Sequence, residues 1–151
     1  MKIRIFNGKA ESLRAIAEEW KQAAEFNKCG ILVDNVDKYL AQLHLVAYSD
    51  NSDLLVQYDG DVPVGFIGIR YFESPTGNQR IANENYYYVL KKHRTESLDL
   101  FKMAKILAGL KGCDRLIMNA SNLAPEMHDK ICKMYQRNGL MLFETSFTCE
   151  V

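Results

Sequence analysis

The stretch YYYVLKKHRTESLDL, from Tyr86 to Leu100, decides the fold. It begins as an aromatic strand, passes through a basic cluster from Lys91 to Arg94, and ends in the first turn of a helix. The start of a helix carries N–H groups without partners and a partial positive charge, so it binds anions such as phosphate. We therefore expect either an anion site at this turn, with the Arg94 fork on two phosphate oxygens, or only a solvated loop between strand and helix.

Outward from this stretch, apolar periodicity and turn residues divide the chain into strands and helices. Asp59-Gly60 lies between two apolar runs and predicts a tight hairpin. The expected strands are 2–6, 54–58, 62–72, 80–90, 115–120 and 140–150, and the expected helices are 11–26, 35–48, 97–111 and one that opens at 122–125 and stops at Gly139. The order predicts an α+β fold with a mixed, mostly antiparallel central sheet flanked by about four helices.

Length and charge narrow the class of protein. The chain has 151 residues, so we expect a single domain over 1–151. Lys+Arg and Asp+Glu number 19 each, which argues against a nucleic-acid binder. The four cysteines are widely spaced, with no paired metal ligands, and we expect them to be reduced and mostly buried. With no signal peptide and no membrane-spanning run, the expected location is the cytoplasm.

Two motifs make the sequence resemble the GNAT superfamily of N-acetyltransferases. Val89, a short linker and Arg94 to Asp99 occupy the places of the family's strand end and Arg-Gly-x-Gly-x-Gly/Ala turn, and Tyr135 to Leu140 matches its Tyr-x-x-x-Gly-Phe. The sequence also resembles small GNAT-type proteins encoded by tailed bacteriophages, at Tyr88-Val89, His93-Arg94, Met118, Leu123-Ala124-Pro125 and Glu144. The resemblance implies acetyl-CoA as co-substrate, held by Tyr88, Val89, Leu90, Arg94, Thr95, Glu96, Ser97, Leu98, Asp99 and Asn122.

The turn departs from the family pattern at its glycines. Thr95, Ser97 and Asp99 stand where the family has Gly, Gly, and Gly or Ala. Glycine lets the backbone approach a phosphate without a Cβ in the way, and a carboxylate at Asp99 repels pyrophosphate unless it points away. This departure favours a second hypothesis, that of an interaction protein with the same fold and no cofactor.

Acetylation of an amine requires a group that takes up a proton and a donor to the departing thiolate. Tyr135 is the candidate donor, and the alternative is a core tyrosine with an anchored hydroxyl. Glu84 is the candidate base, and the alternative is an ion-pair partner on a neighbouring strand. Strict alternation predicts that Glu84 shares a sheet face with Tyr86 and Tyr88, opposite Val89. Asn119 and Asn122 follow the next strand and are candidates to bind the pantetheine arm.

Two functions follow from the sequence. The first is an acetyl-CoA-dependent N-acyltransferase that acts on an unidentified amine by direct attack, without a covalent enzyme intermediate. The second is a catalytically degenerate interaction protein, such as a phage virion component or an inhibitor of a host protein, located in the host cytoplasm or the virion. An exposed edge strand would permit a homodimer, and the sequence does not choose between these partners.

Overall fold

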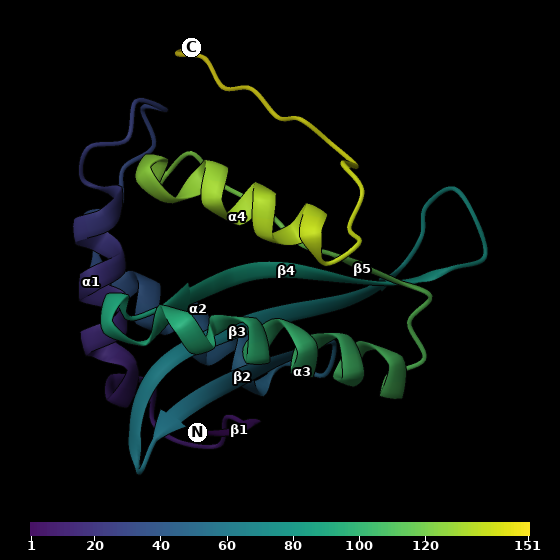
Figure 1. Cartoon of the computed structure of the whole chain (residues 1–151), viewed down its shortest axis with the longest axis horizontal. Coiled ribbons are helices and arrows are strands. Elements are labelled where there is room, and N and C mark those ends of the chain that lie inside the picture. Colours follow the sequence, from purple (N-terminus) through teal and green to yellow (C-terminus); the bar gives the residue numbers. More distant parts are fainter.

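The computed structural model describes residues 1–151 as a five-stranded sheet with helices on both faces (Figure 1). The strands lie in the order β1-β2-β3-β4-β5. Neighbours from β1 to β4 pair antiparallel, and β5 pairs parallel to β4. The strands are β1 (Lys2–Ile5), β2 (Ser52–Asp59), β3 (Val62–Glu73), β4 (Arg80–Val89) and β5 (Arg115–Ile117). The helices are α1 (Arg14–Ala24), α2 (Val36–Tyr48), α3 (Ser97–Leu110) and α4 (Pro125–Arg137), with short 3-10 helices η1 (Ala10–Leu13) and η2 (Lys91–Glu96).

Local sequence signals account for several of these boundaries. The hairpin turn falls at Gly60, whose φ of 60° lies in the left-handed region that glycine tolerates. The side chain of Asn35 caps α2 by accepting from the Lys38 N–H at 2.9 Å. The last helix starts at Pro125, where a missing N–H costs nothing. The predicted mixed sheet and four flanking helices are therefore confirmed.

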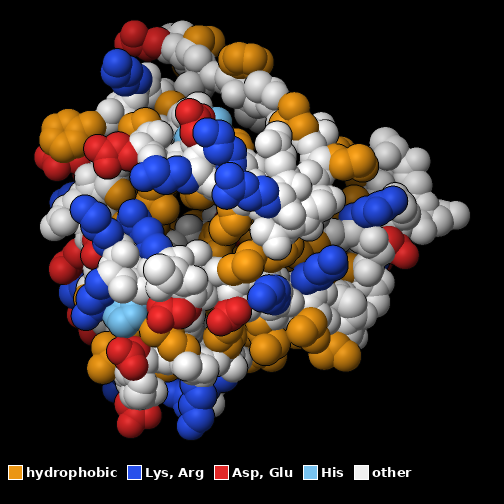
Figure 2. All heavy atoms as spheres, in the orientation of Figure 1, with side chains coloured by type: hydrophobic (Ala, Val, Ile, Leu, Met, Phe, Trp, Pro, Cys, Tyr) orange, Lys and Arg blue, Asp and Glu red, His pale blue; other side chains and the backbone are white.

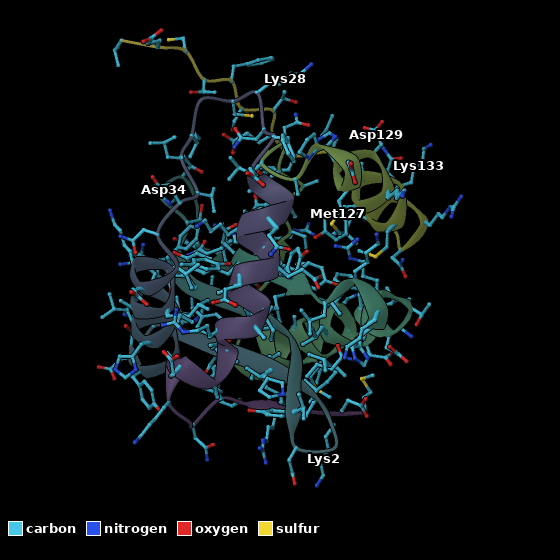
Figure 3. All side chains as sticks on the ribbon, turned by 90° about the vertical axis from the view of Figure 1, so that its left-hand side faces the viewer. Lys2, Lys28, Asp34, Met127, Asp129 and Lys133 are labelled. Atoms are coloured by element: carbon cyan, nitrogen blue, oxygen red, sulfur yellow. The ribbon has the colours of Figure 1, made fainter.

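The sheet separates two apolar cores, as Figures 1 and 3 show from perpendicular directions. On one face α1 and α2 pack against the sheet, with Ile16 and Leu43 fully buried. On the other face α3 packs through Leu100 and Ala104, which are also fully buried. The helix α4 lies on the α3 side, where Tyr135 contacts Phe101 at a ring distance of 6.3 Å.

Three expectations about element boundaries are wrong. The expected strand 115–120 is β5, which ends at Ile117. The expected helix 11–26 is instead the 3-10 turn η1 followed by α1, which ends at Ala24. The expected strand 140–150 does not form, and residues 138–151 have neither helix nor strand. Alternation of apolar residues favours a strand, but a strand also needs a neighbour to accept its backbone hydrogen bonds. Those residues run outside the body of the molecule (Figure 1).

None of the helices combines the length and the apolar character that crossing a membrane requires.

Candidate functional site

The strands β4 and β5 stay together over only three residue pairs. Ile81, Ala82 and Asn83 pair with Arg115, Leu116 and Ile117, and there the ladder ends. The rest of β4, from Glu84 to Val89, has no partner strand on that side. The two strands therefore separate beyond Asn83, and that side of β4 has no partner strand to accept or donate backbone hydrogen bonds.

Asn119 spans the point where the strands separate. Its backbone N–H donates to Glu84 Oε2 at 2.9 Å, and its side-chain amide donates to the Glu84 carbonyl oxygen and, at 3.3 Å, to Asn83 Oδ1. The Tyr135 hydroxyl donates to the Asn119 carbonyl oxygen at 3.3 Å. Asn119 therefore joins the two predicted catalytic side chains, Glu84 and Tyr135, into one hydrogen-bonded group.

A β-bulge places Glu84 on the face opposite to the predicted one. The β3–β4 register shifts so that Ile69 pairs with Glu84 while Gly68 pairs with Tyr86, which leaves Asn85 without a partner. The extra residue reverses the alternation of the strand. Glu84 therefore shares the α3 side of the sheet with Val89, and Tyr86 and Tyr88 point to the α1 side.

Glu84 is a buried carboxyl group, with 4% of its surface exposed. Burial raises the pKa of Glu84 to about 7, although the hydrogen bonds from Asn119 oppose the shift by favouring the charged form. No hydrogen bond reaches its Oε1. A carboxyl group that titrates near neutral pH and keeps one free oxygen is suited to take up a proton.

Tyr135 is buried at 7% exposure between α3 and the β4–β5 fork. Burial raises the pKa of Tyr135, and the nearby Glu84 carboxylate adds to the shift. The side chain therefore remains a protonated phenol, which can donate a hydrogen bond to an acceptor. The structure also places the hydroxyl on a carbonyl oxygen, as expected for an anchored core tyrosine.

The basic linker folds as η2, and its Arg94 guanidinium and Lys91 N–H are engaged within the chain. Arg94 donates from Nη2 to the Tyr88 hydroxyl at 3.0 Å and from Nε to the Val89 carbonyl at 3.4 Å. The Tyr88 hydroxyl and the Lys91 N–H both donate to Glu19 Oε1, at 3.2 and 2.7 Å. The carboxylate of Glu19 on α1 thus holds the linker against the rest of the molecule.

The two acidic residues of the turn, Glu96 and Asp99, differ in burial. Asp99 has a side chain 60% exposed and lies 3.8 Å from Lys102 Nζ. Glu96 turns inward, with a buried Oε2 that has no hydrogen-bond partner. The Ser97 carbonyl accepts from the Tyr87 hydroxyl at 2.7 Å, which ties the first residue of α3 to β4.

Four of the other predicted cofactor residues lie between the end of β4 and the start of α3, and the fifth, Asn122, does not. Val89 is buried, Leu90 donates its N–H to the Val64 carbonyl at 2.9 Å, Thr95 is exposed and Leu98 is half-buried. Asn122 is exposed in the loop before α4 and makes no side-chain hydrogen bond.

Two features escaped prediction. Glu19 lies in α1, and the amphipathic pattern of that helix gives no indication of the contact with Lys91, 72 residues away in the sequence. On α4, Cys132 Sγ lies 3.8 Å from His128 Nε2. The spacing of four residues, one helical turn, was the only signal for that pair.

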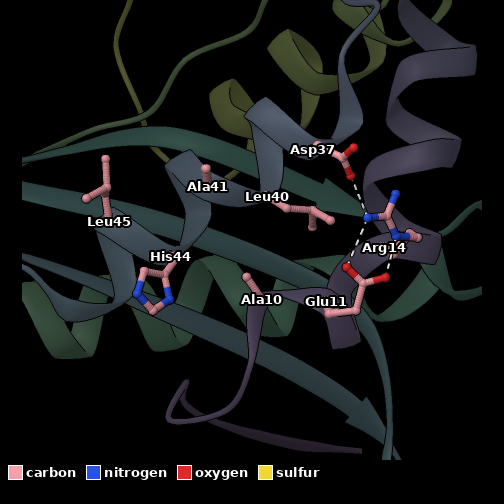
Figure 4. A pocket seen from close by; sticks show the side chains of 8 residues that line it. All are labelled: Ala10, Glu11, Arg14, Asp37, Leu40, Ala41, His44 and Leu45. Atoms are coloured by element: carbon pink, nitrogen blue, oxygen red, sulfur yellow. Dashed lines mark hydrogen bonds and ion pairs between the residues drawn. The ribbon is translucent and has the colours of Figure 1, made fainter.

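A groove of about 410 Å³ lies elsewhere, between the start of α1 and α2 (Figure 4). Arg14 is one of the lining residues, and it bonds Glu11 at 2.5 and 2.9 Å and Asp37 at 2.6 Å. Two carboxylates share one guanidinium, so these three side chains carry a net charge of −1. None of the predicted site residues lines it.

No protein-family model matches the chain, and no curated protein matches it. Its structure is similar to a ribosomal-protein-alanine N-acetyltransferase from Brucella melitensis, with a TM-score of 0.74, 16% identity and 100% of both chains covered. It is also similar to an aminoglycoside N-acetyltransferase in complex with CoA, with a TM-score of 0.74, 17% identity, and 99% of this chain and 93% of that chain covered.

A GNAT family acetyltransferase from Staphylococcus aureus is a further neighbour, with a TM-score of 0.64, 16% identity, and 99% and 98% of the two chains covered. These similarities extend over the whole chain, and at identities of 16–17% they establish the architecture and nothing finer. The chain therefore has the fold of the GNAT acetyltransferases.

Proposed function

We propose that the protein is an N-acyltransferase that moves an acetyl group from acetyl-CoA to an amine. One observation carries the proposal: Glu84, with a pKa of about 7, and the protonated Tyr135 meet through Asn119 where β4 and β5 separate. A neighbour with this fold was solved with CoA, which supports the choice of co-substrate.

The residues of the chain fit the co-substrate. The open edge of β4 from Glu84 to Val89, apart from the Glu84 and Val89 carbonyls that Asn119 and Arg94 occupy, would offer backbone groups to the extended pantetheine arm, by the same physics that adds a strand to a sheet. The start of α3 and the Arg94 guanidinium would hold the pyrophosphate. The exposed Asp99 can point away from it toward Lys102. Acetyl-CoA supplies the activated acetyl group.

In the proposed reaction, the neutral amine attacks the thioester carbonyl directly. The amine loses a proton to Glu84, directly or through water, and a carboxyl group with a pKa near 7 accepts it without being permanently protonated at neutral pH. The Tyr135 hydroxyl releases the Asn119 carbonyl and donates to the departing sulfur as negative charge forms there. No covalent bond to the enzyme is required.

The test is thermal unfolding with and without acetyl-CoA. A ligand that binds only the native state at about 100 times its Kd stabilises it by about 2.7 kcal/mol, so the Tm should rise. Arg94→Ala should abolish this rise. Lys92→Ala is the matched control, because Lys92 is an exposed neighbour in η2 without a side-chain hydrogen bond. A melting curve unchanged by millimolar acetyl-CoA would refute the proposal.

A second candidate function has its own support. Arg94 already donates to Tyr88 and Val89, and the turn contains no glycine, as expected if the fold serves as an interaction protein without a cofactor. Its partner would be a second copy or, if the chain is phage-encoded, a host or virion protein. Absence of the acetyl-CoA shift, together with a larger particle in host extract, would favour this function over the first.

A further inference from the structure

The histidine of α4 and the cysteine one turn after it form a pair, with a carboxylate on the far side of the imidazole. Cys132 Sγ lies 3.8 Å from His128 Nε2, and His128 Nδ1 lies 3.1 Å from Asp129 Oδ1. A neutral imidazole that donates from Nδ1 to the carboxylate keeps Nε2 as an acceptor for the thiol proton. A nucleophile, a base within reach of it and a group that orients the base together are typical of an activated thiol.

The thiol lies at the surface, beside the fork between β4 and β5. Cys132 is half-buried, and the His128 side chain is 30% exposed. The positions 128, 132 and 135 are four and three residues apart, so their side chains share one face of α4. The charge of Cys132 contributes to the raised pKa of Tyr135, as expected for neighbouring groups. A group added to the thiol would therefore stand beside the Tyr135 side chain.

Basic side chains outnumber acidic ones around the pair. The helix α4 contains Lys130, Lys133 and Arg137 against Glu126 and Asp129. Lys and Arg side chains gather over this helix in the space-filling view, and Asp129 and Lys133 lie on consecutive turns of it (Figures 2 and 3). Reactive cysteines occupy partly exposed, electropositive surroundings of this kind. A positive rim attracts an anionic reagent and repels a cationic one.

The position of Cys132 within the helix decides the class of reaction. It lies in the middle of α4, where backbone N–H groups bond to carbonyls four residues earlier. These N–H groups are therefore not free to stabilise the oxyanion that acyl transfer to the thiol would form. Attack on a disulfide forms no oxyanion. The charge appears on the departing sulfur, to which a protonated imidazole can return its proton.

We propose that Cys132 is a modification site that forms a mixed disulfide with an anionic low-molecular-weight disulfide, with His128 as the base. The thiol proton passes to His128 Nε2, and Sγ attacks one sulfur of the reagent. A new S–S bond forms as that of the reagent breaks, and the departing thiolate takes the proton from His128. Cys132 is oxidised and the leaving sulfur is reduced, so no further reagent is required. The site is independent of acyl transfer.

The experiment exposes the full chain to oxidised glutathione, an anionic disulfide, and follows each of the four cysteines by peptide mass spectrometry. Cys132 should be the first to be modified. His128→Gln should slow its modification by about tenfold or more, because the base is lost. The exposed Cys149 reports on the same sample, and its rate should not change. His44→Gln is the matched control, because this exposed histidine stacks on Tyr48 in α2.

Cystamine, a cationic disulfide, tests the charge of the reagent. Each rate at Cys132 is divided by the rate of the same reagent with a neutral model thiol, N-acetylcysteine amide. The relative rate should be higher for oxidised glutathione than for cystamine, and the difference should shrink as salt screens the charges of α4.

Three results would overturn the proposal. One is that another cysteine reacts first in the wild-type chain. Another is that His128→Gln leaves the ratio of the Cys132 and Cys149 rates unchanged. The third is a higher relative rate for cystamine. The first and third need only the wild-type chain, so they decide the proposal even if the variant does not fold.

Discussion

Glu84 makes the stability of the protein depend on pH. Its pKa is about 7 in the folded chain against 4.5 as the ordinary value, so the native state holds more protons than the unfolded state between those limits. Its contribution is therefore fully present below pH 4.5 and is lost as pH rises through 7, by an amount on the order of 3 kcal/mol. Glu84→Gln lacks this titration, so the variant should gain Tm relative to wild type between pH 5 and pH 8. A constant difference across that range would contradict the buried carboxyl.

The same residue should set the rate of acyl transfer. If Glu84 takes up the proton, kcat/KM should rise with an apparent pKa near 7, and Glu84→Gln should lower it by about 10²–10⁴-fold. Acetyl-CoA binding, measured by the Tm shift, should persist in the variant. Glu73→Gln is a suitable control, because this carboxylate is exposed in an ion pair with Arg80. Equal losses in both variants would remove Glu84 from the reaction.

For single residues, the sequence predicts which side chains form the site better than it predicts the face of the sheet on which each side chain lies. The motif around Tyr135 and the carboxylate in β4 identify two side chains that the structure joins through Asn119. The face of Glu84 was predicted wrongly, because the bulge at Asn85 depends on the pairing with β3 and leaves no local signal. Contacts such as that of Glu19 with Lys91 are also tertiary, and helix periodicity does not contain them.

Among the elements, β4 and α3 both approach the central strand β3 closely at Gly65. A Cβ on Gly65 would lie 2.8 Å from Val89 Cγ2 and 3.2 Å from the Tyr88 carbonyl oxygen in β4, and 3.3 Å from Leu100 Cδ1 in α3. Gly65→Ala should therefore lower the free energy of unfolding by about 1–3 kcal/mol through overpacking. Gly109→Ala is the matched control, because the exposed Gly109 in α3 has nothing within 4 Å of a Cβ and should gain about 0.5–1 kcal/mol. Urea unfolding of both variants gives the comparison.

The sequence predicts helices and strands correctly where each element has a neighbouring element in the chain to pair with or pack against. The hairpin at Gly60 and the helix that starts at Pro125 were predicted from turn and cap residues, and the structure confirms both. The expected strand 140–150 does not form, although its alternation is regular. Apolar periodicity indicates which face of a strand would be buried, but it does not indicate whether a neighbouring strand is present to pair with it. Strand β5 is likewise shorter than the expected 115–120, since its pairing with β4 ends at Ile117.

Across the whole molecule, two cores share one sheet, and they should unfold together. Leu43 lies in the core on the α2 side and Leu100 in the core on the α3 side, both fully buried. Leu→Ala at either position should cost about 2–5 kcal/mol and lower a single transition. In calorimetry the van't Hoff and calorimetric enthalpies should then agree for both variants. Two resolved transitions in either variant would show that the sheet does not couple the cores.

The stacking around Tyr88 has an optical consequence. Trp20 is the single tryptophan of the chain, and its ring lies 5.6 Å from that of Tyr88, over which the Arg94 guanidinium sits at 5.6 Å. If Arg94 moves to bind the pyrophosphate of acetyl-CoA, as proposed, it withdraws a cation from the tyrosine next to the indole. The fluorescence emission of Trp20 should therefore change when acetyl-CoA binds. Binding can then be followed in real time without a label and without an acceptor amine.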